Sequence, residues 1–256
     1  MGTGYFSRIG KRFVLAVQFL TILPVAAVRS VSDADMRQSV VFYPVVGLFL
    51  GGGLWTLQWI LTRVLPATAA TVISLAVYTV MTGFLHLDGM IDMADALGSR
   101  KPRQKALLIM RDSRVGAIGA ASGVLVLLGK FAVLSNLSIH MAGAFIVIPA
   151  LSRWSMVLAM SMAPYARVDQ AGLGSLFANQ ISWVSVGIAS LIAMGAAVVL
   201  LPMRMAVSLW LFVFLGTVLF VRLLTRRFGG MTGDIYGALN ELMEWLGWTL
   251  VLLWHG

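Results

Sequence analysis

Long apolar runs separated by short polar connections are the dominant pattern along this chain. A helix that crosses a bilayer needs about 20 mainly apolar residues. Runs that approach or exceed this length predict spans at residues 39–62, 67–86, 116–136, 140–162, 181–201, 205–223 and 238–254. A further run at 13–28 is shorter and contains Gln18 and Pro24, which favours an interfacial or re-entrant helix. The pattern predicts an all-α, polytopic membrane helix bundle with about six to seven transmembrane helices and this short N-terminal helix.

Composition excludes a soluble globular domain of this size. The 256 residues are 59% hydrophobic and only 11% charged, and the mean hydropathy is +0.91. The chain has no cysteine, so it has neither a disulfide framework nor a thiolate that could bind metal or act as a nucleophile. No composition shift or repeat marks a boundary, and we expect one integral membrane domain over residues 1–256.

Positive charge is distributed unequally across the predicted membrane. One side holds the N-terminus and three polar connections, at 87–115, 163–180 and 222–237. Fifteen of the nineteen Lys and Arg residues lie there, whereas Arg63 and Arg204 lie opposite, and Lys130 and Arg153 fall inside spans. Cytoplasmic loops carry such an excess, so this side is expected to face the cytoplasm. The net charge of +9 then indicates contact with anionic lipid, not nucleic acid.

Three of the ten acidic residues occur in the stretch from His86 to Asp95. Asp88, Asp92 and Asp95 are spaced i, i+4 and i+7, which places them on one face of a helix. Like charges on one helix face repel, and a divalent cation would reverse that repulsion. Oxygen ligands without cysteine suit Mg²⁺ or Mn²⁺. His86 is a candidate base or ligand at the start of the stretch.

A second polar cluster spans residues 110–119. Arg111 and Arg114 suit bidentate binding of phosphate, and Ser113 lies between them. Asp112 is an acid in a basic loop, and we predict that it completes a metal shell. Gly116 and the following glycine would let backbone N–H groups bind an anion at a helix N-terminus. The nearby cations at 100–105 are interpreted as topology signals only.

Further polar residues are expected at the same membrane boundary. Arg153 is a costly charge inside a span, so it serves either the site or an internal ion pair. Arg167 follows the fourth long span. Gly229-Gly230 and Thr232-Gly-Asp234 form a third acidic, glycine-rich element, able to supply anion-binding backbone. Glu241 and Glu244 are predicted to fall at this boundary too.

Two functions fit these residues on physical grounds. One is a membrane enzyme that transfers a phosphoryl-linked group with carboxylate-bound Mg²⁺. The other is a cation-coupled transporter, whose acids would lie near the bilayer midplane on broken helices. The acids cluster beside arginines at one membrane face, which favours the enzyme.

The motifs resemble those of one family, the cobalamin synthases or adenosylcobinamide-GDP ribazoletransferases. The resemblance covers nearly the whole chain and rests on residues 19–24, 42–47, 86–95, 110–116, 152–154, 164–167 and 229–234. It implies an inner-membrane, Mg²⁺-dependent transferase that joins adenosylcobinamide-GDP to α-ribazole or its 5′-phosphate and releases GMP. The Asp-Gly-x-x-Asp-x-x-Asp core of 88–95 also resembles part of the CDP-alcohol phosphotransferase signature, but that signature's Ala-Arg pair and final aspartate are unmatched.

Site roles follow as hypotheses from this resemblance. The metal ligands would be Asp88, Asp92, Asp95 and Asp112. Catalytic roles are assigned to His86, Asp92 and Arg111. The substrates, a corrinoid nucleotide and α-ribazole, would be bound by Arg111, Ser113, Arg114, Arg153, Arg167 and Asp234. Membrane lipid is a further expected partner, and association with a second copy or with pathway enzymes stays open.

Overall fold

The computed structural model describes residues 3–25, 28, 31–166, 177 and 180–255. Its helices are α1 (Thr3–Leu20), α2 (Asp33–Ser39), the short 3₁₀ helix η1 (Val40–Phe42), α3 (Tyr43–Leu61), α4 (Ala67–Met81), α5 (Leu85–Gly98), α6 (Arg103–Ile109), α7 (Ala117–Asn136), α8 (Ala142–Met162), α9 (Trp183–Leu200), α10 (Met203–Phe228) and α11 (Gly233–His255). Extended pairing in the described chain amounts to one isolated bridge, between Tyr165 and Met231. The predicted all-α class is confirmed.

Five helical segments are long and apolar enough to cross a membrane, and α4 with α5 make a sixth if this bent pair is one span. The five are Asp33–Leu61, Ala117–Asn136, Ala142–Met162, Trp183–Leu200 and Met203–Phe228. They coincide with five of the predicted spans, so the polytopic bundle is confirmed. The predicted span at 238–254 lies within α11, which is not among these segments and carries Asn240, Glu241 and Glu244 in its first half.

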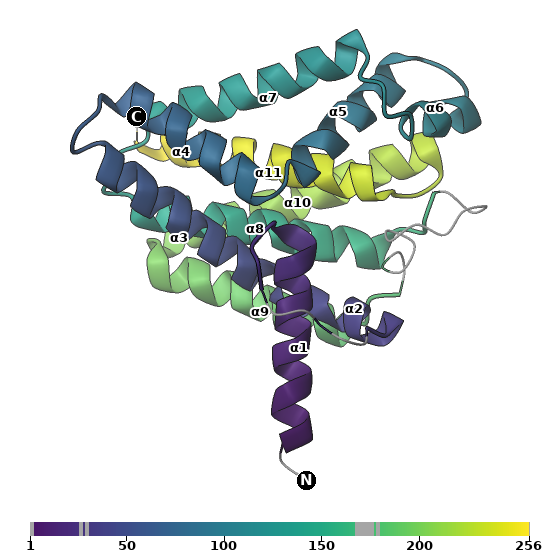
Figure 1. Cartoon of the computed structure of the whole chain (residues 1–256), viewed down its shortest axis with the longest axis horizontal. Coiled ribbons are helices and arrows are strands. Elements are labelled where there is room, and N and C mark those ends of the chain that lie inside the picture. Colours follow the sequence, from purple (N-terminus) through teal and green to yellow (C-terminus); the bar gives the residue numbers. More distant parts are fainter. Residues whose placement is uncertain (1–2, 26–27, 29–30, 167–176, 178–179, 256) are drawn as a thin grey trace.

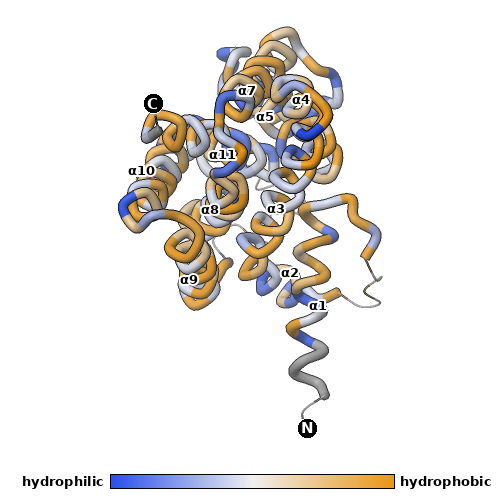
Figure 2. The backbone as a smooth tube through the Cα atoms, turned by 90° about the vertical axis from the view of Figure 1, so that its left-hand side faces the viewer, coloured by the Kyte–Doolittle hydropathy of each residue, from blue (hydrophilic) through white to orange (hydrophobic). Residues whose placement is uncertain are grey.

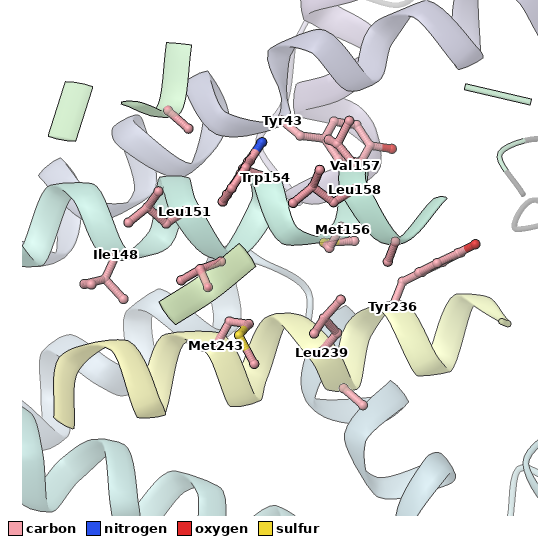
Figure 3. Close-up of a cluster of buried hydrophobic side chains, with 14 of the residues drawn as sticks. Tyr43, Ile148, Leu151, Trp154, Met156, Val157, Leu158, Tyr236, Leu239 and Met243 are labelled. Carbon is pink, nitrogen blue, oxygen red and sulfur yellow. The ribbon is translucent and has the colours of Figure 1, made fainter. Parts of the chain in front are cut away.

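Helix α8 forms the centre of the bundle. In this helix 89% of the membrane-spanning window is buried, compared with 28% in α9 and in α10. A helix that is mainly apolar and covered on all sides belongs to the interior. Figure 3 shows buried side chains on opposite sides of α8: Trp154 and Val157 lie on the side of Tyr43 of α3, and Ile148 and Met156 lie on the side of Leu239 and Met243 of α11. Figure 2 shows that the long helices are largely hydrophobic along their length.

Two glycines set the close packing of α3 on α8. A Cβ atom at Gly47 would lie 2.4 Å from the carbonyl oxygen of Pro149, and one at Gly51 would lie 2.5 Å from that of Phe145. These positions are four residues apart, so one face of α3 contacts the backbone of α8 directly. Gly52 has no heavy atom near its missing Cβ, so it is not part of this contact.

The predicted span at 67–86 is interrupted near its end by a break in the helix. Helix α4 ends at Met81 and α5 begins at Leu85, and the two helices are bent by 87°. Gly83 and Phe84 between them have positive φ angles of 60° and 58°. A left-handed conformation is costly for a bulky residue such as Phe84, so the surrounding packing holds this break in place. The polar region predicted at 87–115 therefore contains two helices, α5 and α6.

The N-terminal helix has different bounds from those predicted. Helix α1 runs from Thr3 to Leu20 and ends before Pro24, and it is not among the membrane-spanning segments. In Figure 1 it runs across the direction of the long helices, and its N-terminal half extends beyond the bundle. Leu15, Ala16 and Leu20 near its C-terminal end are buried against the bundle.

Candidate functional site

The acidic stretch forms helix α5 at one end of the bundle. The turns that lead into α7 and α11 lie at this same end, on the right in Figure 1, whereas the C-terminus lies at the other. Asp88 is exposed, and Asp92 and Asp95 are half-buried. The helix confirms the predicted geometry, in which the three acids share one face.

Helix α5 packs so closely on α11 that Asp234 becomes its neighbour. A Cβ atom at Gly89 would lie 2.6 Å from the backbone oxygen of Asp234. A Cβ at Gly237 would lie 3.1 Å from the Cα of His86. The contact places the first turn of α11 beside the turn of α5 that carries Asp88 and Asp92. The structure thus brings together two of the three predicted acidic elements.

The carboxylate of Asp95 is hydrogen-bonded to the start of α7. Its two carboxylate oxygens accept hydrogen bonds from the backbone N–H groups of Gly116 and Gly119, each at 2.7 Å. The glycines permit this approach, because a Cβ atom at either would lie within about 2.5 Å of the carboxylate. The anion expected at this helix N-terminus is therefore a side chain of the protein itself. Asp95 satisfies N–H groups that would otherwise lack partners and lies at the favourable end of the helix dipole.

The turn before α7 presents exposed cations. Arg111, Ser113 and Arg114 are exposed. Asp112 accepts hydrogen bonds from the Arg114 guanidinium, with 2.6 Å between Nη2 and Oδ2, and from the Arg114 backbone. These bonds lower the pKa of Asp112 to about 2. Asp112 thus pairs with a cation in this structure, whereas it was predicted to complete a metal shell.

A short paired segment closes the same end of the bundle. Ala166 donates its N–H to the carbonyl of Met231, and Met231 donates to Pro164, both at 2.9 Å. Arg103 lies against Gly229 and donates from Nη2 to the carbonyl of Ala166 at 3.3 Å. Sequence reasoning assigned Arg103 to topology alone, and nothing in the sequence indicated this contact. The predicted substrate-binding Arg167 lies outside the described residues.

The predicted four-aspartate metal set is not assembled as one ligand shell. Among the residues that the structure describes, no three His, Asp or Glu side chains are grouped so that they could hold a metal ion. Asp88 and Asp92 share a helix face, and Asp234 begins the neighbouring helix. This donor set suits Mg²⁺, which proteins often hold with one or two carboxylates while substrate phosphates and water supply the other ligands.

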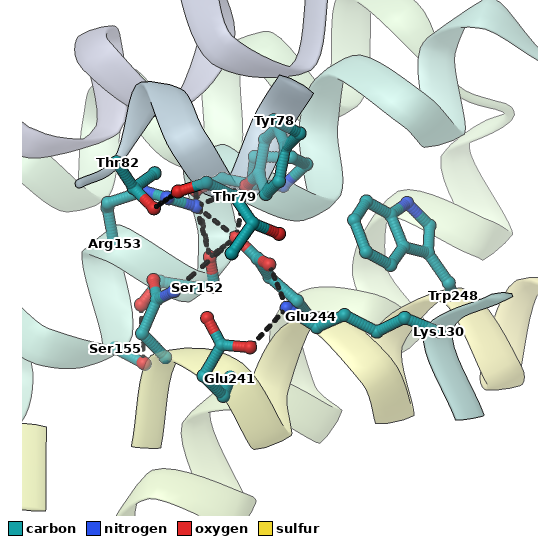
Figure 4. Close-up of polar contacts among 12 residues, drawn as sticks. Tyr78, Thr79, Thr82, Lys130, Ser152, Arg153, Ser155, Glu241, Glu244 and Trp248 are labelled. Carbon is teal, nitrogen blue, oxygen red and sulfur yellow. Dashed lines mark hydrogen bonds and ion pairs between the residues drawn. The ribbon is translucent and has the colours of Figure 1, made fainter. Parts of the chain in front are cut away.

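A second polar cluster lies inside the bundle (Figure 4). Lys130 of α7 donates to Glu241 at 2.7 Å and to Glu244 at 2.5 Å, and both glutamates belong to α11. Glu244 also pairs with Arg153 of α8 and accepts a hydrogen bond from Tyr78 of α4. All of these side chains are buried inside the bundle. Arg153 has the internal anionic partner that a charge inside a span requires.

His86 lies on the buried side of α5 and does not reach the surface. It is 1% exposed, and neither ring nitrogen has a hydrogen-bond partner. Nε and Nη2 of Arg153 also lack partners. The structure therefore places His86 and Arg153, both predicted site residues, in the interior behind the exposed face of α5.

The fold and the site define a helical membrane protein with an acidic and cationic end suited to a phosphorylated substrate. This chain belongs to the cobalamin-5-phosphate synthase family, whose model matches residues 12–252. An adenosylcobinamide-GDP ribazoletransferase of Desulforamulus reducens is 37% identical over 94% of this chain and 95% of its own. Proteins of the same name from Desulfitobacterium hafniense and Syntrophobacter fumaroxidans are 35% and 38% identical, over 92% and 91% of this chain and 94% of their own. No solved structure matches the chain.

Family membership confirms the resemblance seen in the motifs and identifies the chain as a transferase of cobalamin biosynthesis. It favours the predicted enzyme over both the CDP-alcohol phosphotransferase and the cation-coupled transporter.

Proposed function

We propose that this protein joins adenosylcobinamide-GDP to α-ribazole, or to its 5′-phosphate, and releases GMP at the cytoplasmic face of the inner membrane. The names of its relatives support the substrates. The observation that carries the site is the contact of Gly89 with the backbone of Asp234, which joins two acidic elements at the cation-rich end of the bundle. The positive-inside rule supports the orientation.

The reaction replaces a phosphoanhydride bond to GMP by a phosphate ester bond to the ribazole. A hydroxyl of the ribazole attacks the phosphorus that carries cobinamide, a new P–O bond forms, and the bond to the GMP oxygen breaks. The hydroxyl proton passes to a carboxylate of the acidic set, for which we propose Asp92, because it lies at the half-buried face of α5. Arg111, which is exposed, would bind phosphate oxygens.

Mg²⁺, or Mn²⁺ in its place, would be held by Asp88 and Asp92 with Asp234 nearby. When bound, the ion neutralises charge that develops on the diphosphate and the leaving group. Asp95 has a different role in this proposal: it fixes the start of α7 and with it the turn that carries Arg111. Asp112 likewise orients Arg114, and buried His86 and Arg153 support α5 from behind.

A purified, membrane-reconstituted protein tests this proposal. It is incubated with adenosylcobinamide-GDP, α-ribazole 5′-phosphate and Mg²⁺, and GMP and the corrinoid product are measured together. We expect equal amounts of both, and loss of both with EDTA. Asp88→Asn and Asp92→Asn should each lower turnover by more than about 100-fold, since a metal ligand matters at least as much as the groups that orient it.

Asp33→Asn is the matched control, because Asp33 is an exposed acid on α2, outside the site. Its turnover should equal that of the wild type. If Asp88→Asn and Asp92→Asn also kept full Mg²⁺-dependent turnover, the metal assignment would be rejected. A folded wild type that made no product from these substrates but accepted a CDP-alcohol would reject the proposed reaction.

A further inference from the structure

A groove outside the acidic site lies between α1, η1 and the start of α9. Its volume is about 400 Å³, and its apolar lining comes from Ile9, Val41, Phe42, Val184 and Ile188. A smaller cavity of about 170 Å³ adjoins it and shares Gln38, Ser182 and Ser185 with it. Together they form a continuous hollow that is apolar on one side and polar on the other.

Two arginines supply positive charge at the polar side, where Lys11 and Arg12 share the single carboxylate of Asp35. Arg12 lines the groove, its Nε has no hydrogen-bond partner, and the nearest carboxylate oxygen, from Asp35, is 3.9 Å away. Asp35 is already engaged by Lys11 at 2.5 Å. Arg37 lines the smaller cavity and donates to Gln180, a neutral side chain, at 2.6 Å. Neither guanidinium is therefore neutralised by a close ion pair among the described residues of the hollow.

The position of α1 relates this hollow to the membrane surface. Helix α1 runs across the direction of the long helices (Figure 1), as expected for a helix in the membrane interface. Arg8, Lys11 and Arg12 are on this helix. Trp183 and Val184, at the start of α9, are 71% and 72% exposed. Exposed apolar side chains beside cations match the boundary between acyl chains and headgroups.

We infer that this hollow is a binding site for one anionic phospholipid. The phosphodiester would bind Arg12 and Arg37, and an acyl chain would lie along Val41, Phe42 and Ile188. Basic pockets between helices at the cytoplasmic side of membrane proteins bind anionic headgroups in this way. Free phosphate would contact only the arginines and would leave the apolar lining exposed. A zwitterionic headgroup is disfavoured because its own positive charge would be repelled by the two arginines. The bound lipid would fasten α1 to the bundle. This inference does not depend on the reaction proposed above.

Competition between lipids tests the site. The protein is purified in detergent, exchanged into mixed vesicles of phosphatidylglycerol and phosphatidylcholine, extracted mildly, and analysed by native mass spectrometry for retained lipid. The wild type should retain one phosphatidylglycerol with a preference of about tenfold or more, as two nearby basic residues predict. Arg12→Gln with Arg37→Gln should abolish the preference. Arg204→Gln, an exposed arginine at the other end of the bundle, should leave it unchanged.

Equal retention of both lipids by the wild type, or an unchanged preference in the double variant, would overturn the inference. Displacement of the lipid by inorganic phosphate alone would assign the site to free phosphate. If the double variant did not fold, as judged by its helical circular dichroism and thermal transition, single Arg37→Gln would decide, with an expected reduction of the preference by at least about threefold.

Discussion

Glu244 is expected to be the most important acid for the stability of this protein. It is fully buried and contacts three other helices: Lys130 at 2.5 Å on α7, Arg153 on α8 and Tyr78 on α4. Glu244→Gln keeps the shape of the side chain but removes its charge. Lys130 and Arg153 would then share the single charge of Glu241, which contacts only the lysine.

The expected cost follows from the charge that is left behind. Breaking a buried ion pair by removing one partner costs about 3–5 kcal/mol, because the other charge stays buried without compensation. Glu244→Gln should fall in this range. Glu241→Gln should cost less, about 1.5–3 kcal/mol, because it removes one charged hydrogen bond while Lys130 keeps Glu244. The double variant Glu244→Leu with Arg153→Met should regain stability relative to Glu244→Leu alone, since it removes both charges.

Reversible unfolding by SDS in mixed micelles, followed by circular dichroism, measures these free energies. Each variant is compared at the same detergent composition, and Glu244→Leu, Arg153→Met and their double variant form a double-mutant cycle. A cost for Glu244→Gln that is equal to or smaller than that for Glu241→Gln would refute the reasoning. So would a double variant less stable than Glu244→Leu alone.

Three further predictions concern the acidic end of the bundle. Gly89→Ala should lower turnover at least about tenfold, because its Cβ would lie 2.6 Å from the Asp234 backbone oxygen, whereas Gly52→Ala, which faces open space, should have no effect. Asp95→Ala should lower the thermal transition by an amount that corresponds to about 1–2 kcal/mol, since it removes the side-chain cap of α7. The Asp112 pKa is lowered to about 2, so its ion pair contributes fully above about pH 4 and is lost as the pH falls toward 2; the turnover ratio of Asp112→Asn to wild type should be constant above about pH 5.

The fold was predictable wherever the apolar pattern was continuous. Three of the five confirmed spans agree with the structure to within a few residues, and the other two, in the α2–α3 and α10 segments, are longer than predicted. The break at Gly83 and Phe84 was not predictable, because an apolar run gives the same signal whether its helix is straight or bent. The bend depends on a left-handed Phe84, which only the packing around it can hold.

The site could be predicted as a set of segments but not as a set of contacts. Spacing alone placed Asp88, Asp92 and Asp95 on one helix face, and the structure confirms it. It could not show that Asp95 turns to α7, since both an ion and a helix N-terminus attract a carboxylate. The partner of Arg153 was likewise open, because pairing with Glu244 joins residues 91 positions apart. Such long-range pairs leave no local pattern in the sequence.

The buried charges hold the helices together, and this packing positions the exposed acids of α5. The cluster around Glu244 ties α4, α7, α8 and α11 together inside the bundle. With α4 held there, the break at Phe84 directs α5 away from the direction of α4, so its acids reach the end of the bundle. Asp95 then fixes α7, and Gly89 admits α11, on two sides of the same helix. Acids that are already paired within the protein, such as Glu244 and Asp95, hold the helices in place. Asp88 is exposed on the face of α5 that these contacts position, so we expect it to be the acid that meets a substrate.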